Sequence, residues 1–179
     1  MPHPLVERLR ARGFVMPDYD GGGLLNLSAT VLDVLGARVA TDAPALTGLD
    51  PALCEGVKQV VVVLADGLGW WQLEMLCDQG DTPFLAELRD RARRRDRAQL
   101  IEATTVFPST TAAAITTVNT ARTPLEHGNI AYFLWLEEFA EVTAMLRWGR
   151  ATMRRGSYFD DPAVDPRPPA RARHPVARR

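Results

Sequence analysis

Residues 59–65 read Gln59-Val60-Val61-Val62-Val63-Leu64-Ala65, and Asp66-Gly67-Leu68-Gly69 follows directly. A continuous run of β-branched and apolar residues is typical of a strand that is buried on both faces in a parallel sheet. The glycines after the run end the strand and favour a turn. The stretch therefore predicts a parallel strand with Asp66 at its carboxyl end.

Helical periodicity appears on both sides of this run. Apolar residues recur at helical spacing from Leu24 to Leu35, and Gly36 supplies a stop. Thr82 and Pro83 are a typical cap and first residue for a further helix. Helices are expected, in chain order, over residues 24–35, 70–77, 83–95 and 112–120.

The order of these elements indicates the fold class. Residues 99–104 are short and apolar enough for a second strand, so the chain reads strand, helix, strand, helix. That order predicts a right-handed crossover and an α/β fold, with a mostly parallel sheet and helices on both faces. Residues 132–136 and 141–146, separated by an acidic turn, predict an additional hairpin.

Length and composition predict one main domain. The chain has 179 residues and 46% hydrophobic residues, enough for one sizeable core. We expect an N-terminal extension over residues 1–23 and an α/β domain over residues 24–160. Residues 161–179 are rich in Pro and Arg and poor in large apolar side chains, which predicts a disordered tail.

Charge and apolar patterning exclude several classes of protein. The formal net charge of −1 argues against nucleic-acid and membrane-surface binding. No segment has the length of a membrane span or the pattern of a signal peptide. Cys54 and Cys77 lack the close pairing of a zinc or redox motif, so reduced thiols and a cytoplasmic location are expected.

Two turns carry the residues suited to chemistry. Asp66 follows a predicted parallel strand, and ligands of open α/β folds bind at that edge of the sheet. A carboxylate followed by the flexible glycines Gly67 and Gly69 could bind a metal, or it could cap the following helix or its turn. Ser109, Thr110 and Thr111 precede an Ala-rich helix whose N-terminus favours an anion such as phosphate. Each hydroxyl could equally be a helix cap.

Three segments together resemble a known family: Val61-Val62-Val63-Leu64-Ala65-Asp66-Gly67, Thr105-Val106-Phe107-Pro108-Ser109-Thr110-Thr111-Ala112-Ala113-Ala114 and Thr120-Ala121-Arg122-Thr123-Pro124-Leu125-Glu126-His127-Gly128. They resemble the type I phosphodiesterase and nucleotide pyrophosphatase branch of the alkaline phosphatase superfamily. The resemblance spans about Leu24 to Asp165.

The resemblance implies a partial alkaline-phosphatase-like core and a phosphoester hydrolase. Its substrate would be a small phosphodiester or phosphomonoester, cleaved through a phospho-threonine intermediate. A complete enzyme of this kind would hold two divalent metal ions, expected to be zinc, with Asp66 among the ligands. His127-Gly128 resembles a family motif whose His is structural or near the substrate. Mutase and sulfate-ester activities stay open within the superfamily.

Two registers compete for the nucleophile. A threonine directly before Phe-Pro would fall on Val106, which has no hydroxyl. Counting back from His127-Gly128 gives Thr111, which we prefer as nucleophile and metal ligand, with Thr110 and Ser109 as reserves.

Other positions near this motif are less specific. Ala121 stands where relatives usually carry Gly, which would strain the turn after the helix. Asn129 and Tyr132 could contact a phosphate, or they could be a turn asparagine and a buried tyrosine.

Most metal ligands of the superfamily have no counterpart in the sequence. Its only histidines are His3, His127 and His174, and Asp160, Asp161 and Asp165 lack a nearby His partner. We therefore expect a truncated chain with impaired activity, dependent on a partner chain or a missing C-terminal part. The alternative is a non-catalytic α/β fragment or binding module. Haloacid-dehalogenase chemistry is excluded because position 68 is Leu, and the dinucleotide fingerprint lacks its third glycine.

Overall fold

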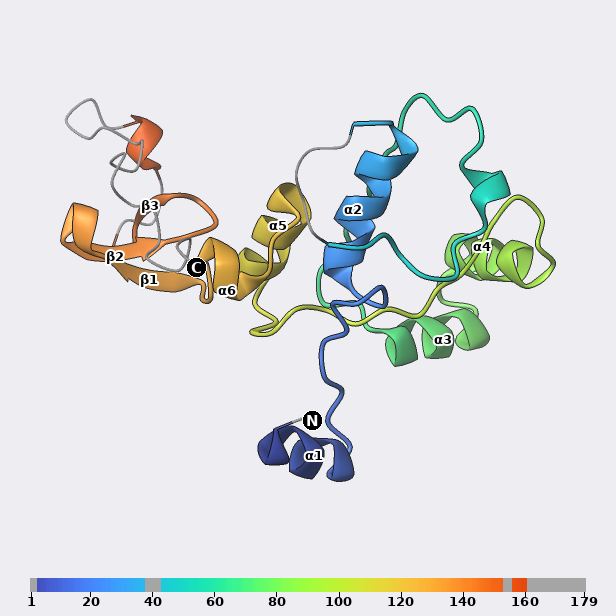
Figure 1. The fold of residues 1–179 in the computed structure, drawn as a ribbon, viewed down its shortest axis with the longest axis horizontal. Coiled ribbons are helices and arrows are strands. Elements are labelled where there is room, and N and C mark those ends of the chain that lie inside the picture. Colours follow the sequence, from blue (N-terminus) through green and yellow to red (C-terminus); the bar gives the residue numbers. More distant parts are fainter. Residues whose placement is uncertain (1–2, 38–42, 153–155, 161–179) are drawn as a thin grey trace. The chain divides into compact units, whose positions relative to one another are not determined.

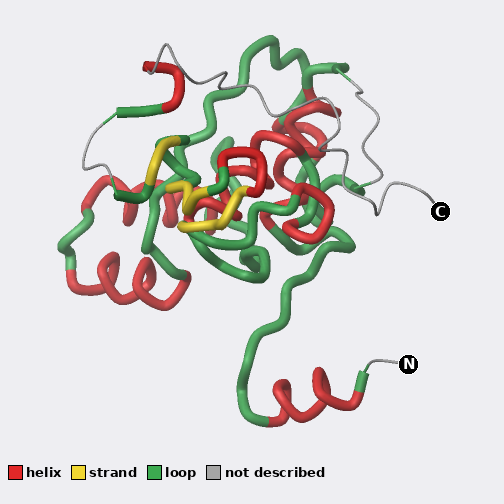
Figure 2. The backbone as a smooth tube through the Cα atoms, turned by 90° about the vertical axis from the view of Figure 1, so that its left-hand side faces the viewer, coloured by secondary structure: helices red, strands yellow, loops and turns green. Residues whose placement is uncertain are grey.

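The computed structural model describes residues 3–37, 43–152 and 156–160. These residues contain six α-helices, three 3₁₀-helices and one three-stranded antiparallel sheet (Figures 1 and 2). They divide into two compact units. One unit is Asp18–Thr104, and the other combines the residues up to Pro17 with those from Thr105 onward.

The unit Asp18–Thr104 contains three α-helices that the sequence predicts. They are α2 (Leu24–Val34), α3 (Trp70–Gln79) and α4 (Pro83–Arg93), and the 3₁₀-helix η1 (Pro51–Leu53) lies between the first two (Figure 1). Gly36 and Gly80 follow α2 and α3 with φ of 65° and 81°, a left-handed backbone that glycine adopts without strain.

Buried polar side chains tie this unit together. Asn26 of α2 is fully buried, and its Nδ2 donates to the backbone oxygens of Tyr19 and Pro44, at 2.9 Å each. Arg89 of α4 is buried, and its Nη1 donates to Asp78 at 2.7 Å and to Glu74 at 3.2 Å. These ion pairs join α4 to α3 and offset the cost of removing the guanidinium from water.

The predicted parallel sheet is not formed by the described residues. Residues 59–65 and 99–104 contain no strand; the one parallel contact is an isolated bridge between Gly23 and Thr104. The run Val60–Leu64 lies exposed between η1 and α3 (Figure 1). A strand requires backbone hydrogen bonds from a neighbour, and apolar composition alone cannot supply that neighbour.

The second unit confirms the predicted helix and hairpin and adds two helices. It contains α1 (Pro4–Ala11), α5 (Thr111–Thr120) and α6 (Pro124–His127). The helix α1 lies inside the predicted N-terminal extension, for which no element had been assigned. His3 Nδ1 caps it by accepting from the Leu5 N–H.

The hairpin forms the small sheet of this unit. Strand β1 (Phe133–Leu136) pairs antiparallel with β2 (Glu141–Ala144), in the register Phe133 to Ala144, and β3 (Gly149–Arg150) extends the sheet. The 3₁₀-helix η2 (Glu137–Phe139) connects β1 to β2, and η3 (Tyr158–Asp160) follows β3. Tyr158 is 2% exposed and stacks on Phe139.

No helix within the described ranges is long and apolar enough to cross a membrane. Cys54 and Cys77 are both free thiols, and Cys77 is buried. The predicted disordered tail, residues 161–179, lies outside the described residues.

Candidate active site

Asp66 lies in an exposed turn after the valine run. Gly67 next to it has φ of 70°. The N-cap of the following helix α3 is Gly69, whose backbone N–H donates to Gln72 Oε1 at 2.7 Å. Gly69 and Gln72 therefore cap α3, and Asp66 does not occupy the N-cap position. Asp66 therefore does not cap α3, whereas a cap of its own turn stays an alternative, since Asp66 takes part in an interaction within its own chain.

The three predicted hydroxyls lie at the start of α5 and differ in their surroundings. Thr110 is the N-cap, because its Oγ1 accepts from the Ala113 N–H at 3.3 Å. Thr111 is the first residue of the helix and is half-buried, whereas Ser109 is exposed. The capping explanation thus applies to Thr110. The nucleophilic role of Thr111, with Thr110 and Ser109 in reserve, remains a prediction.

The base of α5 is anchored in the core of its unit. Val106 is 1% exposed, and Ala112 and Ala113 of the first helical turn are equally buried. The Phe-Pro register would make Val106 the nucleophile position, but this side chain packs inside the protein and has no hydroxyl. The count from His127-Gly128, which gives Thr111, remains a prediction.

His127 makes two hydrogen bonds, one of which connects α6 to α5. Its Nδ1 accepts from the Asn129 N–H at 3.0 Å, so the ring proton lies on Nε2 and is donated to Thr117 Oγ1 at 3.1 Å. Thr117 is fully buried, and burial lowers the pKa of His127. A neutral imidazole with both nitrogens engaged is suited to holding two helices together.

The start of α6 is fixed by a capping box. Thr123 Oγ1 and N–H both donate to Glu126 Oε2, at 2.8 and 2.7 Å. Burial opposes ionisation of Glu126, but these hydrogen bonds and Arg122 outweigh it and lower the pKa of the carboxyl. The helix that carries His127 is therefore capped at both ends. The capping box begins it, and Gly128, with φ of 74°, ends it.

Residues 60–156 match the model of a known family, type I phosphodiesterase / nucleotide pyrophosphatase. The match covers more than half of the chain. The chain belongs to this family. No curated protein and no solved structure matches the chain. The matched segment contains Asp66, the hydroxyls before α5 and His127-Gly128, which are the positions that carry the sequence resemblance. Membership associates the chain with phosphodiesterase and pyrophosphatase hydrolases.

Asn129 and Tyr132 were the predicted substrate contacts of this phosphodiesterase-family chain. Asn129 Nδ2 donates to Thr116 Oγ1 at 2.8 Å and to the backbone oxygen of Ala112 at 3.4 Å. Its amide therefore braces α5. Tyr132 is 42% exposed and its ring contacts Phe133, so the explanation as a buried tyrosine is wrong.

The donors of the predicted metal centre belong to different units. Asp66 belongs to Asp18–Thr104, whereas Thr111 belongs to the other unit, and their approach remains a prediction. Across residues 3–37, 43–152 and 156–160, no group of three His, Cys, Asp or Glu side chains could hold a metal ion. Zinc in proteins takes about four ligands, so the described residues do not fit a two-metal centre.

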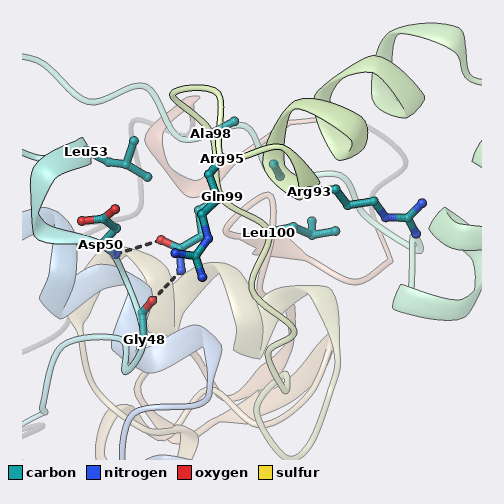
Figure 3. A pocket seen from close by; sticks show the side chains of 9 residues that line it. Gly48, Asp50, Leu53, Arg93, Arg95, Ala98, Gln99 and Leu100 are labelled. Carbon is teal, nitrogen blue, oxygen red and sulfur yellow. Dashed lines mark hydrogen bonds between the residues drawn. The ribbon is translucent and has the colours of Figure 1, made fainter.

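A cavity of about 510 Å³ lies elsewhere in the unit Asp18–Thr104. Figure 3 shows Gln99 bridging two backbone groups at its wall: Nε2 donates to the Gly48 oxygen, and Oε1 accepts from the Asp50 N–H at 2.8 Å. Arg93 and Arg95 also line it. None of the predicted site residues does, so this cavity is separate from the candidate active site.

Proposed function

We propose that the protein hydrolyses small phosphoesters, either phosphodiesters or phosphomonoesters, with Thr111 as nucleophile. The observation that carries this proposal is the family match over residues 60–156, which includes Thr111 at the first position of α5. A helix N-terminus favours the phosphate group, because its free N–H groups and dipole stabilise negative charge.

The reaction would proceed in two steps. Thr111 Oγ1 attacks phosphorus; the new O–P bond forms as the bond to the leaving oxygen breaks, and the hydroxyl proton passes to the leaving group through solvent. Water then attacks the phospho-threonine, which releases the phosphate product and restores the hydroxyl. His127 positions α6 against α5 and takes no part in proton transfer, because both ring nitrogens are engaged.

The proposal includes zinc dependence, which is an expectation from the family. Two metal ions would supply Lewis acidity, and Asp66 is the carboxylate proposed as a ligand. Since the described residues hold no group of three donors, the proposed zinc site needs further ligands, from a partner chain or from residues outside the described ranges. Two free thiols are also consistent with a reducing, cytoplasmic location.

The second candidate is a non-catalytic α/β module. The absence of a three-donor cluster within the described ranges favours it. Such a module would retain the fold of the family without turnover.

A metal titration decides between the two functions. Purified protein is assayed with p-nitrophenyl phosphate and bis-p-nitrophenyl phosphate while zinc is added. Hydrolysis that rises with zinc and falls about a thousandfold or more in Thr111→Val supports the hydrolase. The matched control is Thr120→Val, which removes an exposed hydroxyl at the other end of α5. Zero turnover at saturating zinc would favour the module, and equal losses in both variants would exclude Thr111 as nucleophile.

A further inference from the structure

The valine run is exposed and has the residue pattern of a β-strand, although it pairs with no strand among the described residues. Val61 and Val63 are each 86% exposed, whereas Val60, Val62 and Leu64 are 38, 42 and 46% exposed. This alternation has the period of two that an extended strand produces. Within the described part of the chain, no hydrogen bond joins the backbone of Val60–Ala65 to another residue. Exposed strand edges of this kind are templates for pairing with another chain.

The charges at the two ends of the run are opposite. Lys58, the only lysine of the chain, precedes it, and Asp66 follows it. Two copies aligned parallel and in register would place Lys58 beside Lys58 and Asp66 beside Asp66, which is unfavourable. Two antiparallel copies would instead bring each lysine to the other copy's aspartate.

One antiparallel register pairs the opposite charges and also places the most exposed side chains opposite each other. With the two-fold axis at Val62, Lys58 lies opposite Asp66, Val60 opposite Leu64, and Val61 opposite Val63. The most exposed side chains then meet each other, and two opposite-charge pairs close the ends. A shift by one residue would set the more exposed face of one copy against the less exposed face of the other.

We propose that a second copy of this chain is the partner of this edge, paired antiparallel about Val62. Such an interface is isologous, because each copy contributes the same residues to it. Asp66 also takes part in an interaction inside its own chain, and a carboxylate has acceptor sites for more than one donor. The proposal is independent of hydrolase activity, and its test contains no activity measurement.

Charge substitution tests the register. Sedimentation velocity over a concentration series gives the dimer dissociation constant for each variant. Lys58→Glu is expected to raise that constant about tenfold, because two attractive pairs become repulsive. The double variant Lys58→Glu/Asp66→Lys restores opposite charges and is expected to return the constant to within about twofold. Arg8→Glu makes the same charge change on exposed α1 and serves as matched control.

Zero-length carbodiimide coupling identifies the pair directly. A mixture of ¹⁴N- and ¹⁵N-labelled chains is coupled, digested and analysed by mass spectrometry. The expected product is a Lys58–Asp66 isopeptide of mixed isotope content. Within one extended chain these residues are roughly 26 Å apart, too far for direct coupling.

A protein that stays monomeric throughout the concentration series would overturn the proposal. So would a dimer that is insensitive to Lys58→Glu, a double variant no tighter than the single one, or the absence of mixed-isotope isopeptide. Circular dichroism of each variant verifies that the helices are retained.

Discussion

Replacing His127 with alanine is expected to lower the free energy of unfolding by about 1–3 kcal/mol. The imidazole donates from Nε2 to Thr117 Oγ1 at 3.1 Å, and Thr117 is fully buried. Removing the ring leaves that buried hydroxyl without its histidine partner. The Asn129 N–H also loses its acceptor, Nδ1 at 3.0 Å.

A double-mutant cycle isolates the hydrogen bond from the loss of packing. Thr117→Val keeps the shape of the side chain but removes the hydroxyl, so His127→Ala in that background breaks no bond to Thr117. We expect a coupling energy of about 1 kcal/mol between the two positions. Thr120→Val, at the exposed end of α5, is the control and is expected to change stability by less than about 0.5 kcal/mol.

The assay is urea denaturation followed by circular dichroism, combined with amide hydrogen exchange of α5. Exchange of these amides reports on the unit that contains both residues, since the chain has two compact units. If the two single changes add to within about 0.3 kcal/mol of the double change, the hydrogen bond contributes nothing measurable and the structural role of His127 is refuted.

Three further predictions concern stability. Burial lowers the pKa of His127 from 6.5, so the unfolded chain binds more protons than the folded chain in acid. The free energy of unfolding should therefore fall as the pH drops below about 6.5. The fall should be smaller in His127→Gln than in the control His3→Gln. Tyr158→Phe should lower the free energy of unfolding by about 1–2 kcal/mol, because the buried Thr143 loses a hydrogen bond of 3.0 Å. An unchanged midpoint of thermal unfolding would contradict this. Ala140→Gly should stabilise the fold by about 0.5–1 kcal/mol, because Ala140 is exposed and has a left-handed φ of 48°. Ala121 has a similar φ of 50°, but Ala121→Gly also removes a buried methyl group and should be near neutral. Equal gains in the two variants would contradict that difference.

The helices could be predicted because their signals are local. Pro83 begins α4 and Gly36 follows α2, as the sequence indicates. The hairpin was also predictable, since two apolar runs flank an acidic turn. The four-residue helix α6 was missed because it depends on a capping box instead of an apolar stripe.

The parallel strands could not be established from the sequence, because a strand is defined by its partner. The run Val60–Leu64 has the composition of a buried strand, yet its side chains are exposed in the structure. The composition of a segment shows that it is suited to burial in a sheet, but burial also requires a neighbouring strand. The same limit applies to the candidate site: the cap at Thr110 is local, but an approach of Asp66 to Thr111 depends on how distant segments meet.

A glycine triplet explains which segment does meet the second predicted strand. Thr104 donates its N–H to Gly22 and accepts from the Leu24 N–H, both at 2.8 Å. A side chain on Gly23 would come within 2.3 Å of the Asp18 backbone oxygen and 3.2 Å of Thr104 Oγ1. Only glycine allows this close approach, and the successive glycines 21–23 were a signal for it in the sequence. Both backbone groups of Thr104 are engaged there, so the second predicted strand meets the glycine triplet at its last residue.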